Sequence, residues 1–118
     1  EPQELLGLAG GGPQDLPTWL ALAYGAVGAP VLEELVFRGL VLEALRRRLG
    51  AGGAVVVSGL LFGLLHLSEP AAVGPLVLLG VALGWLRVRS GALAPAIALH
   101  LGNNSLALGL AVLGAVAT

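Results

Sequence analysis

Three charged side chains, Glu33, Glu34 and Arg38, interrupt an almost unbroken apolar segment that covers residues 19–45. A charged group at the centre of a bilayer helix costs at least about 2.5–3.5 kcal/mol on insertion scales, so it normally faces the protein interior and has a function there. On an α-helix, Arg38 lies about 40° around the axis from Glu34 but about 140° from Glu33. The spacing therefore predicts a Glu34–Arg38 ion pair, and it leaves Glu33 available for chemistry.

The composition of the chain is that of a membrane protein. Of its 118 residues, 57% are hydrophobic and only 11% are charged, whereas a soluble domain carries about a quarter charged residues. The mean hydropathy is +0.94. The six basic residues form no basic patch, so we expect no nucleic-acid partner. Because the chain has no cysteine, disulfides, thiol nucleophiles and Cys-ligated metals are excluded.

The hydrophobic pattern predicts an all-α fold, a polytopic transmembrane helical bundle with about four spanning helices. A polar, Gly/Pro-rich loop over residues 1–16 precedes a membrane-embedded helical core over residues 17–118. The expected helices cover residues 17–49, 51–67, 71–88 and 92–117. The first exceeds the length that the ~30 Å hydrocarbon core requires, and we expect a kink at Gly28-Ala29-Pro30. The chain begins without Met or a signal peptide, so we expect it to be part of a longer protein with further spanning helices.

Arginine residues lie on one side only of this expected arrangement. Arg46, Arg47 and Arg48 lie between the first and second helices, and Arg87 and Arg89 lie between the third and fourth. The other connections contain no arginine. Because positively charged loops remain in the cytoplasm, both arginine loops are predicted to be cytoplasmic, with their side chains at the lipid headgroups. We therefore expect an integral, multi-pass protein of a bacterial cytoplasmic membrane.

Polar side chains occur at a similar depth in three of the expected helices. At ~1.5 Å per residue, Glu33, His66 and His100 each lie about 16–22 Å from the cytoplasmic end of their helix. Phe62 precedes His66 by four residues, so its ring can pack beside the imidazole and fix it. Asn104 follows His100 by four residues, so two hydrogen-bond donors can point toward one place.

These groups are the ones that hydrolysis of an acyl bond by water requires. A free carboxylate and a histidine, here Glu33 and His66, can deprotonate the water. A pair of donors, here His100 and Asn104, can stabilise the oxyanion of the tetrahedral intermediate, which is worth roughly 3–4 kcal/mol per donor in other enzymes. The pattern therefore favours a hydrolase that acts inside the membrane.

Structural roles compete with each of these assignments. For Glu34 and Arg38 we expect the ion pair to be mainly structural, and a histidine or asparagine in a membrane helix can simply join helices by hydrogen bonds. Asn103 points to a neighbouring face of its helix and is interpreted as a packing residue. Ionisable groups within the membrane also occur in ion- or proton-coupled transporters, although no second Glu-Glu-x-x-x-Arg segment indicates an inverted repeat.

Three motifs in order, Glu33-Glu34-x-x-x-Arg38, Phe62-x-x-x-His66 and His100-x-x-x-Asn104, resemble the signature of a known family. It is the CAAX protease and bacteriocin-processing (CPBP, or Abi) family, which includes the type II CAAX prenyl endopeptidases. The likeness covers about residues 17–117 and implies that residues 17–118 form an intramembrane catalytic core. The implied catalytic residues are Glu33, His66, His100 and Asn104, and the implied supporting residues are Glu34, Arg38 and Phe62.

The resemblance implies an intramembrane endopeptidase that acts on a membrane-associated peptide or protein. In the prenyl endopeptidases the glutamate and first histidine activate water, and the second histidine and the asparagine form the oxyanion hole. The family also leaves a non-catalytic bacteriocin-immunity or scaffold protein as an alternative. Glu33, His66 and His100 would form a His2Glu set for catalytic Zn²⁺. We favour a mechanism without a metal or other cofactor, because Asn104 is a good donor and a poor zinc ligand.

Overall fold

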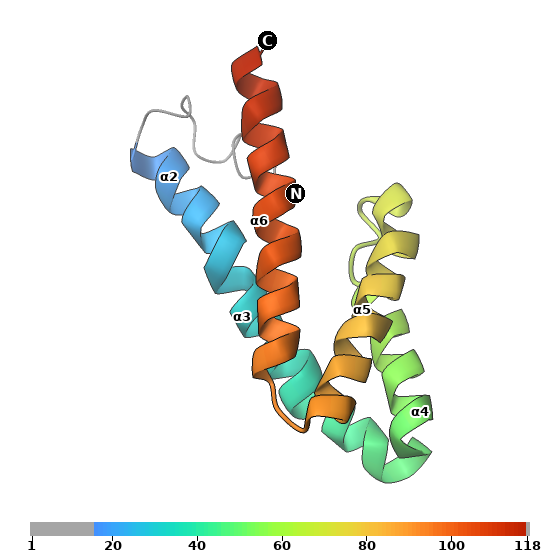
Figure 1. Cartoon of the computed structure of the whole chain (residues 1–118). Coiled ribbons are helices and arrows are strands. Elements are labelled where there is room, and N and C mark those ends of the chain that lie inside the picture. Colours follow the sequence, from blue (N-terminus) through green and yellow to red (C-terminus); the bar gives the residue numbers. More distant parts are fainter. Residues whose placement is uncertain (1–15, 118) are drawn as a thin grey trace. The chain divides into compact units, whose positions relative to one another are not determined.

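The computed structural model describes residues 16–117 and contains only helices and short connections in this range (Figure 1). The elements are α2 (Leu16–Ala23), α3 (Ala29–Glu34), α4 (Leu42–Leu64), α5 (Pro70–Ser90) and α6 (Ala94–Ala117), with π-helices η1 (Tyr24–Gly28) and η2 (Leu35–Val41) between the first three. The predicted all-α fold is confirmed. The loop predicted over residues 1–16 lies outside the described residues, apart from Leu16, which begins α2.

Three helical stretches of the described chain are long and apolar enough to cross a membrane: Leu16–Leu64, Pro70–Ser90 and Ala94–Ala117. The sequence predicted about four, because we treated residues 51–67 as a span of their own. The structure ends this helix at Leu64, so the stretch after Gly50 is only about 21 Å long and falls short of the ~30 Å hydrocarbon core. The prediction of a membrane-spanning, all-α protein is confirmed, and residues 51–64 form the shorter second arm of the first stretch.

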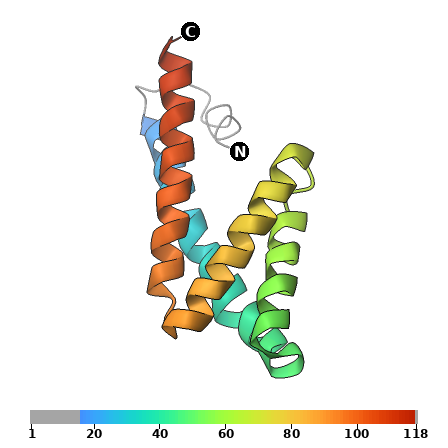
Figure 2. The same cartoon turned by 45° about the vertical axis from the view of Figure 1, so that its right-hand side comes forward.

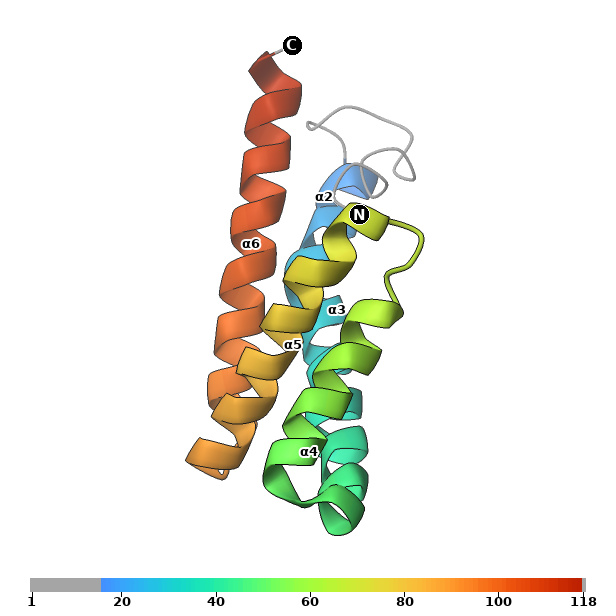
Figure 3. The ribbon, with the colours of Figure 1, turned by 90° about the vertical axis from the view of Figure 1, so that its right-hand side faces the viewer.

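Gly50 is the point at which the first long helical stretch reverses direction. Its backbone angles, φ 76° and ψ 176°, are not helical and lie in a region that is essentially restricted to glycine. Figure 3 shows the ribbon reversing within α4. The predicted boundary between a helix ending at Leu49 and one beginning at Ala51 is thus correct, although the two follow each other without a loop.

The kink predicted at Gly28-Ala29-Pro30 takes the form of a widened helical turn. The N–H of Ala29 donates to the carbonyl of Tyr24, five residues earlier, which is the π-helical pattern. Pro30 explains the local change, because it has no N–H and its ring would clash with the carbonyl four residues before it in an α-helix. The second π-helix, η2, contains no proline, and the sequence analysis did not anticipate it.

The described chain divides into two compact units, one holding residues 16–32 and 100–117 and the other holding Glu33–Leu99. In the second unit, α4 and α5 lie side by side as an antiparallel hairpin (Figures 1 and 2), and η2 packs against both. Glycines make the close approach: a Cβ at Gly80 would lie only 2.9 Å from Cα of Gly59. Small residues at such a crossing are typical of closely packed membrane helices.

The turn between α4 and α5 is longer than predicted, because it covers residues 65–69 instead of 68–70. α4 ends at Leu64, and the N–H of His66 donates to the Gly63 carbonyl at 3.0 Å, so His66 lies in a turn just beyond the helix. Pro70 opens α5, a position where its missing N–H costs nothing. The residue before it, Glu69, lies outside the α region, which a following proline disfavours, with φ −123° and ψ 78°.

Candidate active site

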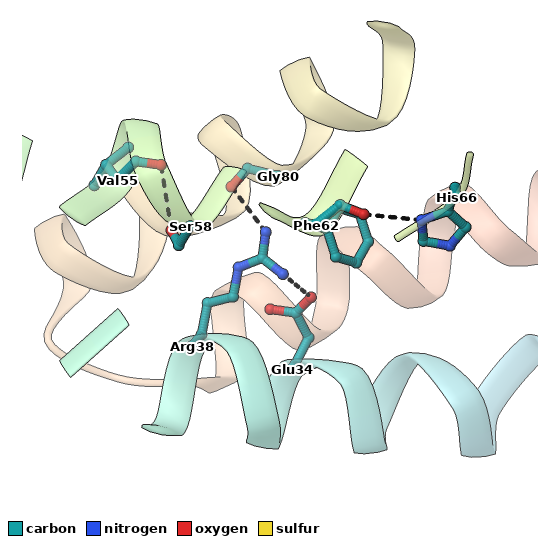
Figure 4. A network of polar contacts seen from close by, with 7 residues as sticks. All are labelled: Glu34, Arg38, Val55, Ser58, Phe62, His66 and Gly80. Carbon is teal, nitrogen blue, oxygen red and sulfur yellow. Dashed lines mark hydrogen bonds and ion pairs between the residues drawn. The ribbon is translucent and has the colours of Figure 1, made fainter. Parts of the chain in front are cut away.

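Arg38 and Glu34 form an ion pair in the interior of the unit that spans Glu33–Leu99. Nη1 of Arg38 lies 3.0 Å from Oε1 of Glu34, and both side chains are fully buried. Nη2 of Arg38 donates to the backbone carbonyl of Gly80 at 2.8 Å, so the guanidinium also links η2 to α5 (Figure 4). The ion pair that the spacing predicted is confirmed. The contact with Gly80 was not predicted, because it joins residues on separate helices.

Two aromatic rings complete the surroundings of this guanidinium. The Cζ atom of Arg38 lies 4.8 Å from the ring centroid of Phe62 and 5.9 Å from that of Phe37. The two rings contact each other edge to face, with centroids 5.5 Å apart and planes at 82°. A cation over an aromatic face is stabilised by the ring quadrupole, most strongly where water is absent. Phe37 therefore belongs to the site, and sequence reasoning missed it because its partner lies on another helix.

Glu33 lies beside this network and is only partly buried. The estimate of about 140° between Glu33 and Arg38 assumed an α-helix, but Arg38 lies in η2, whose wider turns bring residues five apart closer around the axis. Arg38 donates hydrogen bonds to Oε1 of Glu34 and to the carbonyl of Gly80.

His66 is held by the residue four positions before it. Its Nδ1 lies 2.9 Å from the Phe62 carbonyl oxygen, and its ring packs against the Phe62 ring with centroids 5.3 Å apart (Figure 4). The predicted Phe62–His66 contact is confirmed. Because a carbonyl can only accept a hydrogen bond, Nδ1 must carry the hydrogen, and the neutral ring then has its lone pair on Nε2. His66 is therefore set up to act as a base, or as a ligand, through Nε2.

His100 and Asn104 lie on α6, in the part of this helix that belongs to the other unit. His100 is 2% exposed. Nδ2 of Asn104 donates to the carbonyl of Gly25 at 3.3 Å, which ties α6 to η1. The neighbouring Asn103 is exposed. Sequence reasoning expected Asn104 to be a donor but missed Gly25 as its acceptor.

The structure thus brings four of the predicted residues together: Glu34, Arg38, Phe62 and His66 form one connected network, with Glu33 next to it in the chain. The other two predicted residues, His100 and Asn104, belong to the unit that holds residues 16–32 and 100–117. Within residues 33–99, no three His, Cys, Asp or Glu side chains lie together as a metal site would require.

The fold and the network define a class of protein: a helical membrane protein with a charged, histidine-containing network buried among apolar helices. Comparison with known families identifies it further. The chain matches the family model for the type II CAAX prenyl endopeptidase Rce1-like proteins over residues 15–106. It therefore belongs to this family of CAAX-type membrane endopeptidases, and the matched region includes every predicted site residue. No curated protein and no solved structure matches the chain.

Proposed function

We propose that this protein is an intramembrane endopeptidase in which Glu33 and His66 activate a water molecule. His100 and Asn104 supply the oxyanion hole. The observation that carries the proposal is the 2.9 Å hydrogen bond between Nδ1 of His66 and the Phe62 carbonyl, which leaves the lone pair of the neutral ring on Nε2. The family supports the same class of reaction, because its members are prenyl endopeptidases by description.

In this mechanism the Glu33 carboxylate and Nε2 of His66 take a proton from the water as its oxygen attacks the peptide carbonyl carbon. The carbonyl oxygen becomes an oxyanion, which accepts hydrogen bonds from His100 and Asn104. When the intermediate collapses, the C–N bond breaks and the proton held by the base passes to the leaving nitrogen. Atoms and charge balance without any further reactant.

The supporting residues keep this base in place. Arg38 is neutralised by Glu34 and packed against Phe62, and Phe62 in turn contacts His66 through both its ring and its carbonyl. Because Glu34 neutralises the Arg38 charge, this charge perturbs the neighbouring base less than an unpaired guanidinium would. We propose a membrane-associated peptide or protein as the substrate, and prenylated CAAX peptides are the first to test because the family is named for them.

The test is a cleavage assay with purified protein in detergent or lipid, using Glu33→Gln and His66→Asn. Both should lose about 10²–10⁴-fold in rate, the usual contribution of a general base. Asparagine can place its amide N–H near the position of Nδ1 and still donate to the Phe62 carbonyl, so His66→Asn should remain folded. Glu43→Gln, at a partly exposed glutamate, is the matched control and should cleave normally.

Normal cleavage by Glu33→Gln would refute this assignment of the base. If the unmodified protein cleaves no membrane peptide, CAAX-type or other, the immunity, scaffold and transporter alternatives become the better explanations.

Zinc chemistry is the second candidate, because ligating histidines usually donate their other N–H to a carbonyl, as His66 does. A zinc ion held by Glu33, His66 and His100 would activate the bound water as a Lewis acid. Our expectation is that cleavage survives thorough treatment with EDTA or phenanthroline. Loss of activity that stoichiometric zinc restores would instead establish the metal mechanism.

A further inference from the structure

The carbonyl of Gly25 is an unusual acceptor in the middle of a helical stretch. In an α-helix it would accept the N–H of Ala29, but this N–H donates to Tyr24 instead. In the π-helical pattern it would accept the N–H of residue 30, which is a proline and has none. Both helical donors are therefore unavailable to a glycine that is itself buried. A carbonyl in this position requires a partner from elsewhere.

Asn104 supplies that partner, with Nδ2 at 3.3 Å from the Gly25 oxygen. The identity of the amide atom follows from chemistry, because a carbonyl cannot donate and would repel the amide oxygen. An asparagine amide otherwise has a broad, nearly two-fold choice of orientation about its last torsion. The bond to Gly25 removes this choice. Since Nδ2 carries two hydrogens, one can point to Gly25 and the other remains available in the plane of the amide.

We propose that Gly25 and Pro30 are positioning residues for the Asn104 amide: Pro30 releases the Gly25 carbonyl, and this carbonyl orients Asn104 so that its second N–H can stabilise the oxyanion. The inference rests on the proposed function, in which Asn104 is an oxyanion donor. A donor that is oriented before the reaction is worth far more than one that must rotate into place. A flipped amide would present its oxygen and repel the oxyanion.

The test is Pro30→Ala, which restores an N–H at position 30. The Gly25 carbonyl can then accept a hydrogen bond from the new N–H at position 30, or from the N–H of Ala29 if this segment returns to α-helical bonding. Its hydrogen bond with Asn104 should weaken as a result. We expect kcat to fall about ten-fold with KM unchanged, a smaller loss than the 10²–10³-fold for complete removal of an oxyanion donor. Pro75→Ala is the matched control, because Pro75 also lies inside a helix, α5, but in the unit that does not contain Gly25 and Asn104. It should leave both constants unchanged.

The double variant separates positioning from mere support of the fold. In an Asn104→Ala background, Pro30→Ala should have no further effect on kcat, because the amide that it disturbs is gone. Independent, multiplicative losses in kcat would overturn the proposal, as would an unchanged kcat in Pro30→Ala. A purely structural role would instead lower the yield of active protein by the same factor in both backgrounds.

A second pair of variants tests the hydrogen bond without any activity. Asn104→Leu removes the donor and leaves the Gly25 carbonyl without it, whereas Asn103→Leu makes the same change at an exposed neighbour. Asn104→Leu should lower Tm more than Asn103→Leu, and Pro30→Ala should reduce that difference. If the wild-type protein cleaves nothing, the proposed function fails while this cycle still decides whether the bond exists. Equal effects of the two leucines on Tm would overturn the inference even in an active enzyme.

Discussion

At the scale of single residues, the main question is how a guanidinium can remain inside an apolar helix pair. Arg38 has a carboxylate, a backbone carbonyl and two aromatic faces as partners. Each partner has a different role. The carboxylate neutralises the charge, and the carbonyl accepts a hydrogen bond from one of the remaining N–H groups. The two rings exclude water. Burial alone would make such a group very costly, so the site depends on all of them.

Removal of the carboxylate should therefore destabilise the protein more than removal of both charges. We expect Glu34→Gln to cost about 3–5 kcal/mol, because it leaves a buried guanidinium without its counter-charge. Glu34→Gln combined with Arg38→Gln should recover part of this loss. Thermal unfolding of the three proteins in one detergent measures it. A double variant less stable than Glu34→Gln would show that the Gly80 and aromatic contacts of Arg38 matter more than its charge balance.

At the scale of elements, the α4–α5 hairpin positions the network. The Gly80 carbonyl reaches Arg38 because α5 lies against α4 with only hydrogen atoms between their backbones at Gly59 and Gly80. A larger residue at this crossing would move α5 away from η2 and lengthen the bond to Arg38. The packing of small residues and the polar site are thus one structural feature.

A methyl group at this crossing should be damaging. The Cβ of Gly59→Ala would lie 2.6 Å from Cγ2 of Val81 and 2.8 Å from its backbone nitrogen. Relief of this clash would require a shift of the α5 backbone, which costs more than a change of side-chain rotamer. We expect a loss of about 1–3 kcal/mol, typical of overpacking. Gly52→Ala, in the same helix with nothing within 4 Å of its Cβ, should be neutral or stabilising by up to about 1 kcal/mol. Equal melting temperatures of the two variants would contradict this account of the hairpin.

At the scale of the whole molecule, the arginines indicate how the helices are inserted. Glu43 lies 3.7 Å from Arg46 and 3.6 Å from Arg87, so the two arginine segments meet at one end of the unit that spans Glu33–Leu99. Arg89 also stacks on Trp85 at 5.8 Å, an arrangement suited to the headgroup region. By the positive-inside rule, we predict that this end lies in the cytoplasm.

Cysteine labelling can test this orientation cleanly, because the chain has no native cysteine. We expect Ser90→Cys to react with an impermeant maleimide only from the cytoplasmic side, and Ser68→Cys, at the other end of α5, only from the opposite side. Ser58→Cys is the control and should stay unlabelled, since Ser58 is fully buried. Labelling of position 68 from the cytoplasm would reverse the proposed topology.

The sequence by itself determined the features that depend on the local repeat of the helix. Glu34 and Arg38, and likewise Phe62 and His66, are four residues apart, and helical geometry places such residues side by side whatever surrounds them. Glycine and proline marked the reversal at Gly50 and the start of α5 for equally local reasons, namely the conformations that they allow or forbid.

Only the tertiary structure decided which backbone groups complete the site. The bonds from Arg38 to Gly80 and from Asn104 to Gly25 join residues 42 and 79 positions apart, and they depend on which helix faces meet and how closely. The π-helical turns of η2 also have no signal in the sequence, because this segment contains no proline. Every residue has a backbone carbonyl, so the sequence does not indicate which carbonyl will accept a side-chain hydrogen bond. The packing of the helices alone selects that carbonyl.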